Sequence, residues 1–239
     1  MRTFKQANLL GLGLFVFLGL AALGYQLGEA AIKYKEYERI VTVKGLSERE
    51  YNADVVIWPI QFVVASNDLE TMYDLIQSST ANITDFLAIN GIATADISYS
   101  SPSITDKSAR DWGNNARAEF RYSANQNVTV YSSKIDEVRA VMGRLSELGK
   151  KGIVFNSDTY QAQTEYLFTR LNQVKPDMVE EATRNAREVA QKFAADSQSS
   201  LGRIKQATQG QFSIMPRDKN NPHIKKVRVV STIEYYLSD

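Results

Sequence analysis

The sequence predicts an α+β protein, in which an antiparallel or mixed sheet carries about three amphipathic helices and is preceded by one transmembrane helix. Three observations support this prediction. One uncharged, apolar stretch lies near the N-terminus, at residues 6–28. Several later segments alternate apolar and polar residues as strands do, and three others repeat apolar residues at helical spacing. Strands and helices in this irregular order are typical of a sheet with helices on one face.

The stretch from Gln6 to Gly28 is predicted to cross a lipid bilayer, because it contains no charged residue. As a helix it would span roughly 34 Å, which covers a hydrocarbon core of about 30 Å. The predicted organisation has three parts: a cytoplasmic tip and transmembrane anchor at residues 1–28, a helical stem at 29–39, and an exported α+β domain at 40–239.

A cleaved signal peptide remains the alternative for the same stretch. Signal peptides have an apolar region of about 7–15 residues followed by a small-x-small cleavage site. The run from Leu9 to Leu23 already reaches that length, and apolar residues continue to Leu27. Small-x-small sites occur at residues 22–24 and 28–30, which keeps cleavage open. We favour a retained anchor.

The charges that flank the stretch predict its orientation. Arg2 and Lys5 precede it, whereas the charges of residues 29–39 sum to zero. Positive residues stay on the cytoplasmic side of a membrane. We therefore expect a single-pass protein of the bacterial inner membrane, with its N-terminus in the cytoplasm and its main domain in the periplasm.

The composition excludes several classes of protein. The net charge is +1, and subtracting Arg2 and Lys5 leaves −1 for the rest of the chain. No basic field exists to bind nucleic acid. There is no cysteine, which excludes a disulfide scaffold, a thiolate metal site and a cysteine nucleophile.

The first two predicted strands cover residues 40–45 and 54–65. The first alternates apolar and polar residues and stops at Gly45. The second is almost continuously apolar, so we expect it to be covered on both faces for much of its length. Pro59 within it predicts a bulge or an edge position, because proline has no amide hydrogen for the ladder.

The first predicted helix begins at Asn67, with Glu70 completing a capping box, and Gly91 ends it. After a short strand, residues 102–117 are polar and are predicted to form a loop, which is unusually long for one without a function. Trp112 at its tip either contacts a partner or folds back onto the domain; we favour the second.

A second strand–helix–strand block follows. A long strand is predicted over residues 120–130, and Ser133 with Asp136 is predicted to cap the next helix. The two blocks, residues 54–101 and 120–156, have the same layout and suggest an internal structural repeat.

The third helix is predicted to begin at Pro176, a favoured first position, and to run to about Ser199. Alanines recur every four residues in it and would let the helix approach a sheet closely. Two strands at residues 203–214 and 225–237 are predicted to close the chain as a hairpin. The apolar stripe expected along the helix is Met178, Ala182, Ala186, Val189 and Phe193.

A series of short motifs runs in a recognisable order through residues 40–237. The motifs are Val41-Thr42-Val43-Lys44-Gly45, Ala53-Asp54, Gly91-Ile92, Asp96-Ile97, Tyr122-Ser123-Ala124, Val128-Thr129-Val130, Gly149, Gly152-Ile153-Val154-Phe155, Glu181-Ala182-Thr183-Arg184-Asn185-Ala186-Arg187 and Leu201-Gly202. In order and spacing they resemble the SIMPL-domain family of exported bacterial proteins, which includes periplasmic and outer-membrane immunogenic proteins. The resemblance implies an α+β fold, a tendency to form homo-oligomers and no established catalytic activity.

No constellation of residues predicts a catalytic, cofactor or metal site. The one histidine, His223, lies in the predicted terminal turn, where it is expected to be solvated. One histidine without cysteine leaves too few ligands for a usual zinc site. Glu180 and Glu181 fit the start of a helix better than a catalytic pair. The basic run at residues 225–228 is interpreted as the solvent-exposed face of a strand; the alternative is that it binds an anionic partner.

Three functions remain in competition. We favour a membrane-anchored cell-envelope protein that assembles with copies of itself and has a structural or stress-related role without catalysis. The alternative is a periplasmic module that binds a small molecule, lipid or peptide, with residues 102–117 as a lid. An enzyme that uses carboxylates alone is a third hypothesis, for which the sequence nominates no pair.

Overall fold

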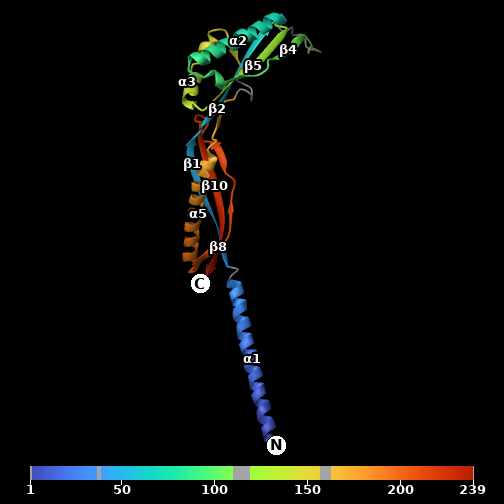
Figure 1. The fold of residues 1–239 in the computed structure, drawn as a ribbon, viewed down its shortest axis with the longest axis vertical. Helices are drawn as coiled ribbons and strands as arrows, with labels where there is room; N and C mark the ends of the chain where they lie inside the picture. Colours follow the sequence, from blue (N-terminus) through green and yellow to red (C-terminus); the bar gives the residue numbers. More distant parts are fainter. Residues whose placement is uncertain (1, 37–38, 110–118, 157–162, 239) are drawn as a thin grey trace. The chain divides into compact units, whose positions relative to one another are not determined.

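The computed structural model describes residues 2–36, 39–109, 119–156 and 163–238 (Figure 1). It confirms the α+β class, with two antiparallel sheets, helices packed on them and one long N-terminal apolar helix. The elements are α1 (Arg2–Glu36), β1 (Ile40–Asn52), β2 (Val55–Ser66), α2 (Leu69–Ile89), η1 (Thr94–Asp96), β3 (Ile97–Tyr99), β4 (Ser103–Asp106), η2 (Lys107–Ala109), β5 (Tyr122–Ser132), α3 (Ile135–Met142), α4 (Ser146–Gly149), β6 (Val154–Phe155), β7 (Glu165–Leu167), α5 (Leu171–Asp196), β8 (Ser200–Gln209), β9 (Ser213–Pro216) and β10 (Ile224–Ser238).

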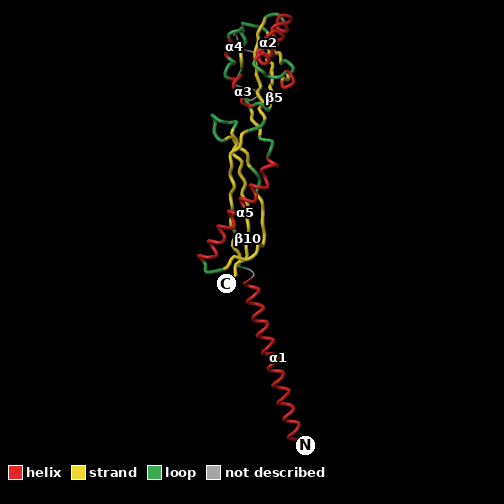
Figure 2. The backbone as a smooth tube through the Cα atoms, turned by 60° about the vertical axis from the view of Figure 1, so that its left-hand side comes forward, coloured by secondary structure: helices red, strands yellow, loops and turns green. Residues whose placement is uncertain are grey.

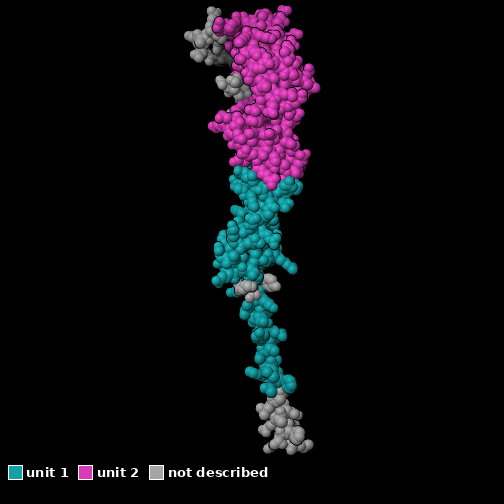
Figure 3. All heavy atoms as spheres, turned by 90° about the vertical axis from the view of Figure 1, so that its left-hand side faces the viewer, with its two compact units in different colours: residues 1–48, 175–213, 228–239 teal, residues 49–174, 214–227 magenta. Residues whose placement is uncertain are grey.

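The chain divides into two compact units, which Figure 3 shows in different colours. Unit 1 comprises residues 1–48, 175–213 and 228–239, and unit 2 comprises residues 49–174 and 214–227. Residues 40–239, predicted as one domain, thus contribute to both units.

Unit 2 contains a sheet with the strand order β3-β5-β2-β6, in which β4 also pairs with β5 and β7 also pairs with β2. The pairings are antiparallel. Along the chain, the elements follow the order β2-α2-β3 and then β5-α3-α4-β6. Together with the strand order in the sheet, this is the split β-α-β connectivity known as ferredoxin-like. The two predicted strand–helix–strand blocks therefore form the two halves of one sheet.

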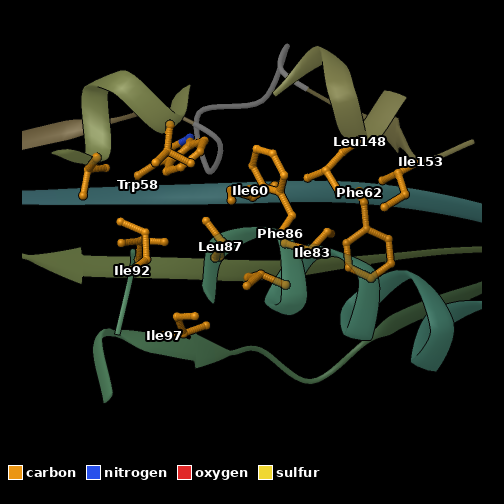
Figure 4. Packing of buried hydrophobic residues seen from close by; sticks show 14 of the residues in the cluster. Trp58, Ile60, Phe62, Ile83, Phe86, Leu87, Ile92, Ile97, Leu148 and Ile153 are labelled. Carbon is orange, nitrogen blue, oxygen red and sulfur yellow. The ribbon is translucent and has the colours of Figure 1, made fainter. Parts of the chain in front are cut away.

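The core of unit 2 lies between this sheet and helices α2, α3 and α4. Strand β2 turns every second side chain toward the helices, and Val56, Ile60 and Phe62 are almost completely buried there. In Figure 4, Phe62 lies beside Ile83 of α2 and Leu148 of α4, in one continuous apolar cluster. Burying a side chain of this size contributes about 1.5–3 kcal/mol.

Strand β2 corrects one expectation and refines another. Its second face is half-buried at Val55, Ile57 and Val63 and buried at Gln61, so the predicted cover on both faces is only partial. Pro59 pairs with Thr129 of β5 in an unshifted register, so no bulge occurs there. On its other side β2 pairs with β7 before Pro59 and with β6 after it, which leaves the proline at a local edge.

The two helix starts of unit 2 also differ from the prediction. Asp68 is the N-cap of α2, and its carboxylate accepts a hydrogen bond of 2.8 Å from the amide of Thr71. Asn67 instead accepts a hydrogen bond from the amide of Arg121. At α3 the N-cap is Lys134, without a side-chain cap, so the predicted capping there is wrong.

The second sheet is ordered β1-β10-β8, with β9 also paired to β10. Unit 1 contains all of β8 and the larger parts of β1 and β10. The predicted terminal hairpin is therefore found as β8 and β9 against β10. Figure 2 shows α5 lying along β10, and Ala186 and Ala190 of α5 pack with Val43 and Ile233 of the sheet. The predicted close approach is present, because a Cβ added to Gly45 would lie 1.8 Å from the carbonyl oxygen of Ala182.

Helix α5 begins earlier than predicted. Pro176 lies inside it rather than at its first position, since the helix already starts at Leu171. Its buried stripe is Met178 with the four alanines from Ala182 to Ala194. Val189 and Phe193, predicted in that stripe, are 39% and 55% exposed.

Helix α1 is continuous from Arg2 to Glu36, into the segment predicted as a stem. Its part from Gly13 to Lys35 is long and apolar enough to cross a membrane, and the side chains of that part are all exposed. Within the predicted loop, Ser103–Asp106 forms β4. Trp112 lies outside the described residues.

Candidate functional site

A groove of about 630 Å³ runs along α2 in unit 2. Helix α2 forms one wall with residues three and four positions apart, which share one helix face. The other wall is formed by β3 and the residues that follow it, and β5 contributes to the floor. The lining residues are Tyr73, Ile76, Gln77, Thr80, Ala81, Thr84, Asp85, Tyr99, Pro102 and Gln126.

Gln126 is the polar side chain at the floor of this groove. It interrupts the helix-facing row of β5, whose neighbouring members Ala124 and Val128 are buried and apolar. Gln126 is itself only 9% exposed. Its amide nitrogen donates to the carbonyl oxygen of Ser100 at 2.8 Å. Its amide oxygen lies 3.0 Å from the hydroxyl of Thr80, which shares its one hydrogen with the carbonyl oxygen of Ile76 at 2.8 Å. The floor of the groove is therefore polar, and hydrogen bonds hold the Gln126 side chain in one orientation.

Tyr99 is held in the wall by Thr84. The Thr84 hydroxyl donates to the carbonyl oxygen of Thr80 at 2.8 Å, so the Tyr99 hydroxyl at 3.1 Å donates to Thr84. The hydrogen bond orients the phenol, while Tyr99 as a whole residue stays 47% exposed. An aromatic face is thus presented beside the groove in a fixed position.

Tyr73, Gln77 and Asp85 leave their polar groups free along the rim. Within the described part of the chain, none of the three side chains makes a hydrogen bond or an ion pair. They are four and eight residues apart on α2, in a row that winds about a third of a turn around the helix as it follows the groove. Free donors and acceptors that converge on one groove are the usual pattern of a small-molecule site.

A second pocket, of about 350 Å³, lies around His223 in unit 2. The start of α3 lines it together with Ala53, whose amide donates to the carbonyl oxygen of His223 at 2.8 Å. The His223 ring lies 6.0 Å from the ring of Tyr166, and its Nδ1 atom is buried without a partner in the described structure. His223 thus lies in a turn, as predicted, but it is half-buried rather than fully solvated.

The surroundings of His223 favour its neutral form. Burial is the main cause that lowers its pKa, and the positive charges of Arg139 and Arg217 lower it further. The carboxylates of Asp136 and Asp218 act in the opposite direction but do not reverse the shift. A neutral imidazole has one donor and one acceptor nitrogen. Ser133 lines the same pocket, but within the described residues no hydrogen bond joins its hydroxyl to His223.

Two further predictions about charged residues are corrected. Lys225, interpreted as part of a wet strand face, is only 8% exposed. Burial lowers its pKa, while Glu165 raises it. Glu180 and Glu181 lie mid-helix, because α5 starts well before them, and Glu181 accepts a hydrogen bond of 2.9 Å from the hydroxyl of Ser47.

Strand β8 lies at an edge of the second sheet, and its residues are unusually exposed to solvent. Every residue from Gly202 to Gln209 is exposed, although alternate residues of a packed strand would be buried. Ile204 is 50% exposed opposite Tyr235, which is buried. From Gln206 to Gln209 the strand pairs with β10 in regular register and carries no charge.

Nothing among the described residues forms a metal site, since no three acidic or histidine side chains gather there. The sequence nominated no catalytic, cofactor-binding or metal-binding residue, and it also missed the groove. Two signals could have revealed it. Gln126 is a polar residue within an inward-facing apolar row, and Tyr73, Gln77 and Asp85 recur at multiples of four residues outside the apolar stripe of the helix.

Comparison with known families gives one assignment. A family model described as "SIMPL: Protein of unknown function (DUF541)" matches residues 41–232. The match covers both units and includes the groove, the His223 pocket and β8. A search of curated proteins finds no significant match.

Proposed function

This chain belongs to the SIMPL family, and from that premise we propose that it is a membrane-anchored cell-envelope protein that assembles with copies of itself and has no catalytic activity. The observation that carries the proposal is the bare edge strand β8. Assembly would place a second copy on this edge, in a structural or stress-related role. The family resemblance, which implies a tendency to form homo-oligomers, supports the same conclusion.

An unpaired strand edge displays a row of amide hydrogens and carbonyl oxygens that can pair with another chain. Proteins that stay monomeric block such edges with charges, prolines or bulges. Here the register shifts and the charges of Arg203 and Lys205 all precede Gln206 in β8. The uncharged segment Gln206–Gln209 remains open, so we place the contact between copies there.

The anchor in this proposal is α1. Its apolar side chains occur all around the helix and are exposed in the protein, as in Phe15 and Phe17 at 77% and 68%. A helix that is apolar on every side needs an apolar environment, which a bilayer provides. Retention of this helix would hold the copies in one membrane and raise their local concentration. The periplasmic location of the domain follows from the charges of Arg2 and Lys5.

Cysteine cross-linking tests the assembly, because the chain has no cysteine of its own. Single cysteines are introduced at Ile204, Gln206 and Thr208 in the full-length protein in membranes, and a mild oxidant is added. We expect a covalent dimer at one or two of these positions. The matched control is Ile89→Cys, which is 82% exposed on α2 and should remain monomeric on denaturing gels.

A head-to-tail arrangement would give a different pattern. If β8 of one copy pairs with β1 of the next, only variants with one cysteine on each strand form covalent ladders. Native mass spectrometry of the uncross-linked protein supplies the number of copies. A monomer at micromolar concentration, together with no cross-link in either set of variants, would contradict the proposal.

A further inference from the structure

We propose that the groove along α2 binds a neutral, hydroxyl-rich ligand, namely a short saccharide chain, with sugar rings against Tyr73 and Tyr99. This site is independent of the proposed assembly, because its lining residues all belong to unit 2 whereas β8 belongs to unit 1. The argument rests on the aromatic surfaces, the free polar groups, the charge and the length of the groove.

The aromatic surfaces suit one side of a sugar ring. Tyr73 and Tyr99 line the groove and are 53% and 47% exposed. A pyranose has a face of C–H bonds, which packs against an aromatic face, and an edge of hydroxyl groups, which does not. Because its hydroxyl is bonded to Thr84, the Tyr99 side chain is held in one position at the wall of the groove.

The free polar groups of the groove suit the hydroxyl-bearing edge of a sugar ring. The amide of Gln77 offers two donors and an acceptor, and the carboxylate of Asp85 accepts from two neighbouring hydroxyls at once. Neither side chain has a partner within the described residues, so a ligand would not need to break an existing bond. The hydroxyl of Tyr73 adds a further donor and acceptor from α2 along the same groove.

The charge of the groove disfavours anionic ligands. Among the lining residues that the structure describes there is no lysine or arginine, and Asp85 is the one acidic residue. A phosphate or a carboxylate ligand needs charged donors or backbone amides, and it would meet repulsion from Asp85 instead. An uncharged ligand with many hydroxyls fits this composition, whereas a lipid tail would leave Gln77 and Asp85 without partners.

The groove is also long and already formed. From Tyr73 to Asp85 the helix advances about 18 Å, which exceeds a single sugar ring and suits a chain of a few rings. The polar floor at Gln126 is fixed by Thr80 and Ser100, so the groove does not need to reorganise before binding.

Isothermal titration calorimetry of the full-length protein tests this inference. The protein is placed in lipid nanodiscs prepared without sugar-based detergents, because a maltoside head group would compete. The probes are cellotriose and triacetylchitotriose. We expect at least one of them to bind with a Kd of about 0.1–1 mM, in the range of a small neutral ligand held by a few hydrogen bonds.

Three variants locate the site. Tyr73→Ala, Gln77→Ala and Asp85→Asn should each weaken binding about fivefold or more, the factor for loss of one net hydrogen bond or ring contact. The matched control is Tyr131→Ala, which removes an equally exposed tyrosine from β5 outside the groove and should leave the affinity unchanged. Circular dichroism of each variant confirms that it is folded.

The same titrations can overturn the inference. No heat from either trisaccharide at about 5 mM, well above the expected Kd, would mean that the groove does not take this ligand. Binding that survives Tyr73→Ala and Gln77→Ala would place the site elsewhere. Trialanine or spermidine binding in preference to both sugars would identify a peptide or a cationic ligand instead.

Discussion

Gly45 is the residue at which the packing of unit 1 is most restrictive. Its hydrogen faces the backbone of α5, and a Cβ there would lie 1.8 Å from the oxygen of Ala182 and 2.5 Å from the amide nitrogen of Ala186. Backbone atoms of a helix cannot move aside as the end of a flexible side chain can. The alanine row of α5 and the glycine of β1 therefore act together, each allowing the approach of the other.

We expect Gly45→Ala to lower the free energy of unfolding by more than about 2 kcal/mol, because helix and strand must separate. Urea denaturation followed by circular dichroism, in one detergent throughout, measures the loss. The control is Gly149→Ala, where an added Cβ meets nothing within 4 Å and a change within about 1 kcal/mol is expected. Equal stabilities of the two variants would contradict the close approach.

His223 should make stability depend on pH. Its pKa is lowered in the folded protein from an ordinary value of 6.5. The unfolded chain therefore binds the proton first on acidification. The stabilisation is fully present above about pH 6.5 and is lost as the pH falls below that value toward the folded pKa.

His223→Gln tests this sign, since the chain contains no other histidine. Between about pH 7.5 and 5.5 we expect the free energy of unfolding to fall less in the variant than in the parent. Urea midpoints at several pH values measure both slopes. A parent that gains stability on acidification, relative to the variant, would show that the folded state holds the proton more tightly.

At the scale of the element, the start of α2 shows how side-chain chemistry decides between neighbouring caps. Asn67 and Asp68 both suit an N-cap by residue type. The structure assigns Asp68, whose pKa is lowered chiefly by the hydrogen bond from the amide of Thr71. The side chain of Asn67 instead accepts a hydrogen bond from the amide of Arg121, which is more than fifty positions away in the sequence. No local sequence pattern could indicate this contact.

Asp68→Ala should therefore destabilise the protein by about 1 kcal/mol, the usual value of an N-cap. Glu70→Ala serves as the control. Its carboxylate makes no cap bond in the described structure, so its loss should cost less than about 0.5 kcal/mol. Thermal unfolding of both variants compares them. A larger loss from Glu70→Ala would instead favour the capping box that the sequence suggests.

At the scale of the whole molecule, the membrane topology is the feature that most constrains the proposed function. We expect Ile89→Cys to react with a membrane-impermeant maleimide in cells whose outer membrane alone is permeabilised. Thr3→Cys should react only after the inner membrane is opened. The reverse order of labelling would contradict the orientation that Arg2 and Lys5 predict.

N-terminal sequencing of the mature protein separates an anchor from a signal peptide. A retained anchor gives an N-terminus at or close to Met1, and the protein resists extraction from membranes at high pH. A cleaved signal gives an N-terminus after one of the two small-x-small sites. The domain would then be a free periplasmic protein, and any assembly of it would not be attached to the membrane.

The sequence by itself determined the α+β class, the order of most elements and the long apolar helix. These depend on local patterns: alternation in the strands, the four-residue alanine row of α5, and glycines such as Gly91 and Gly152, which adopt positive φ at 88° and 84°. The motif order alone was enough to recognise the family that the comparison then assigned.

Only the tertiary structure decided the division into two sheets, the exposed edge of β8, the partial burial of His223 and the groove along α2. Each depends on which segments meet across long sequence separations, as when Gln126 meets Thr80 and the amide of Ala53 meets the carbonyl oxygen of His223. A residue pattern records the preference of a segment for helix or strand and for one buried face. It does not record which distant segment covers that face, and the sites of this protein are formed where such cover is incomplete.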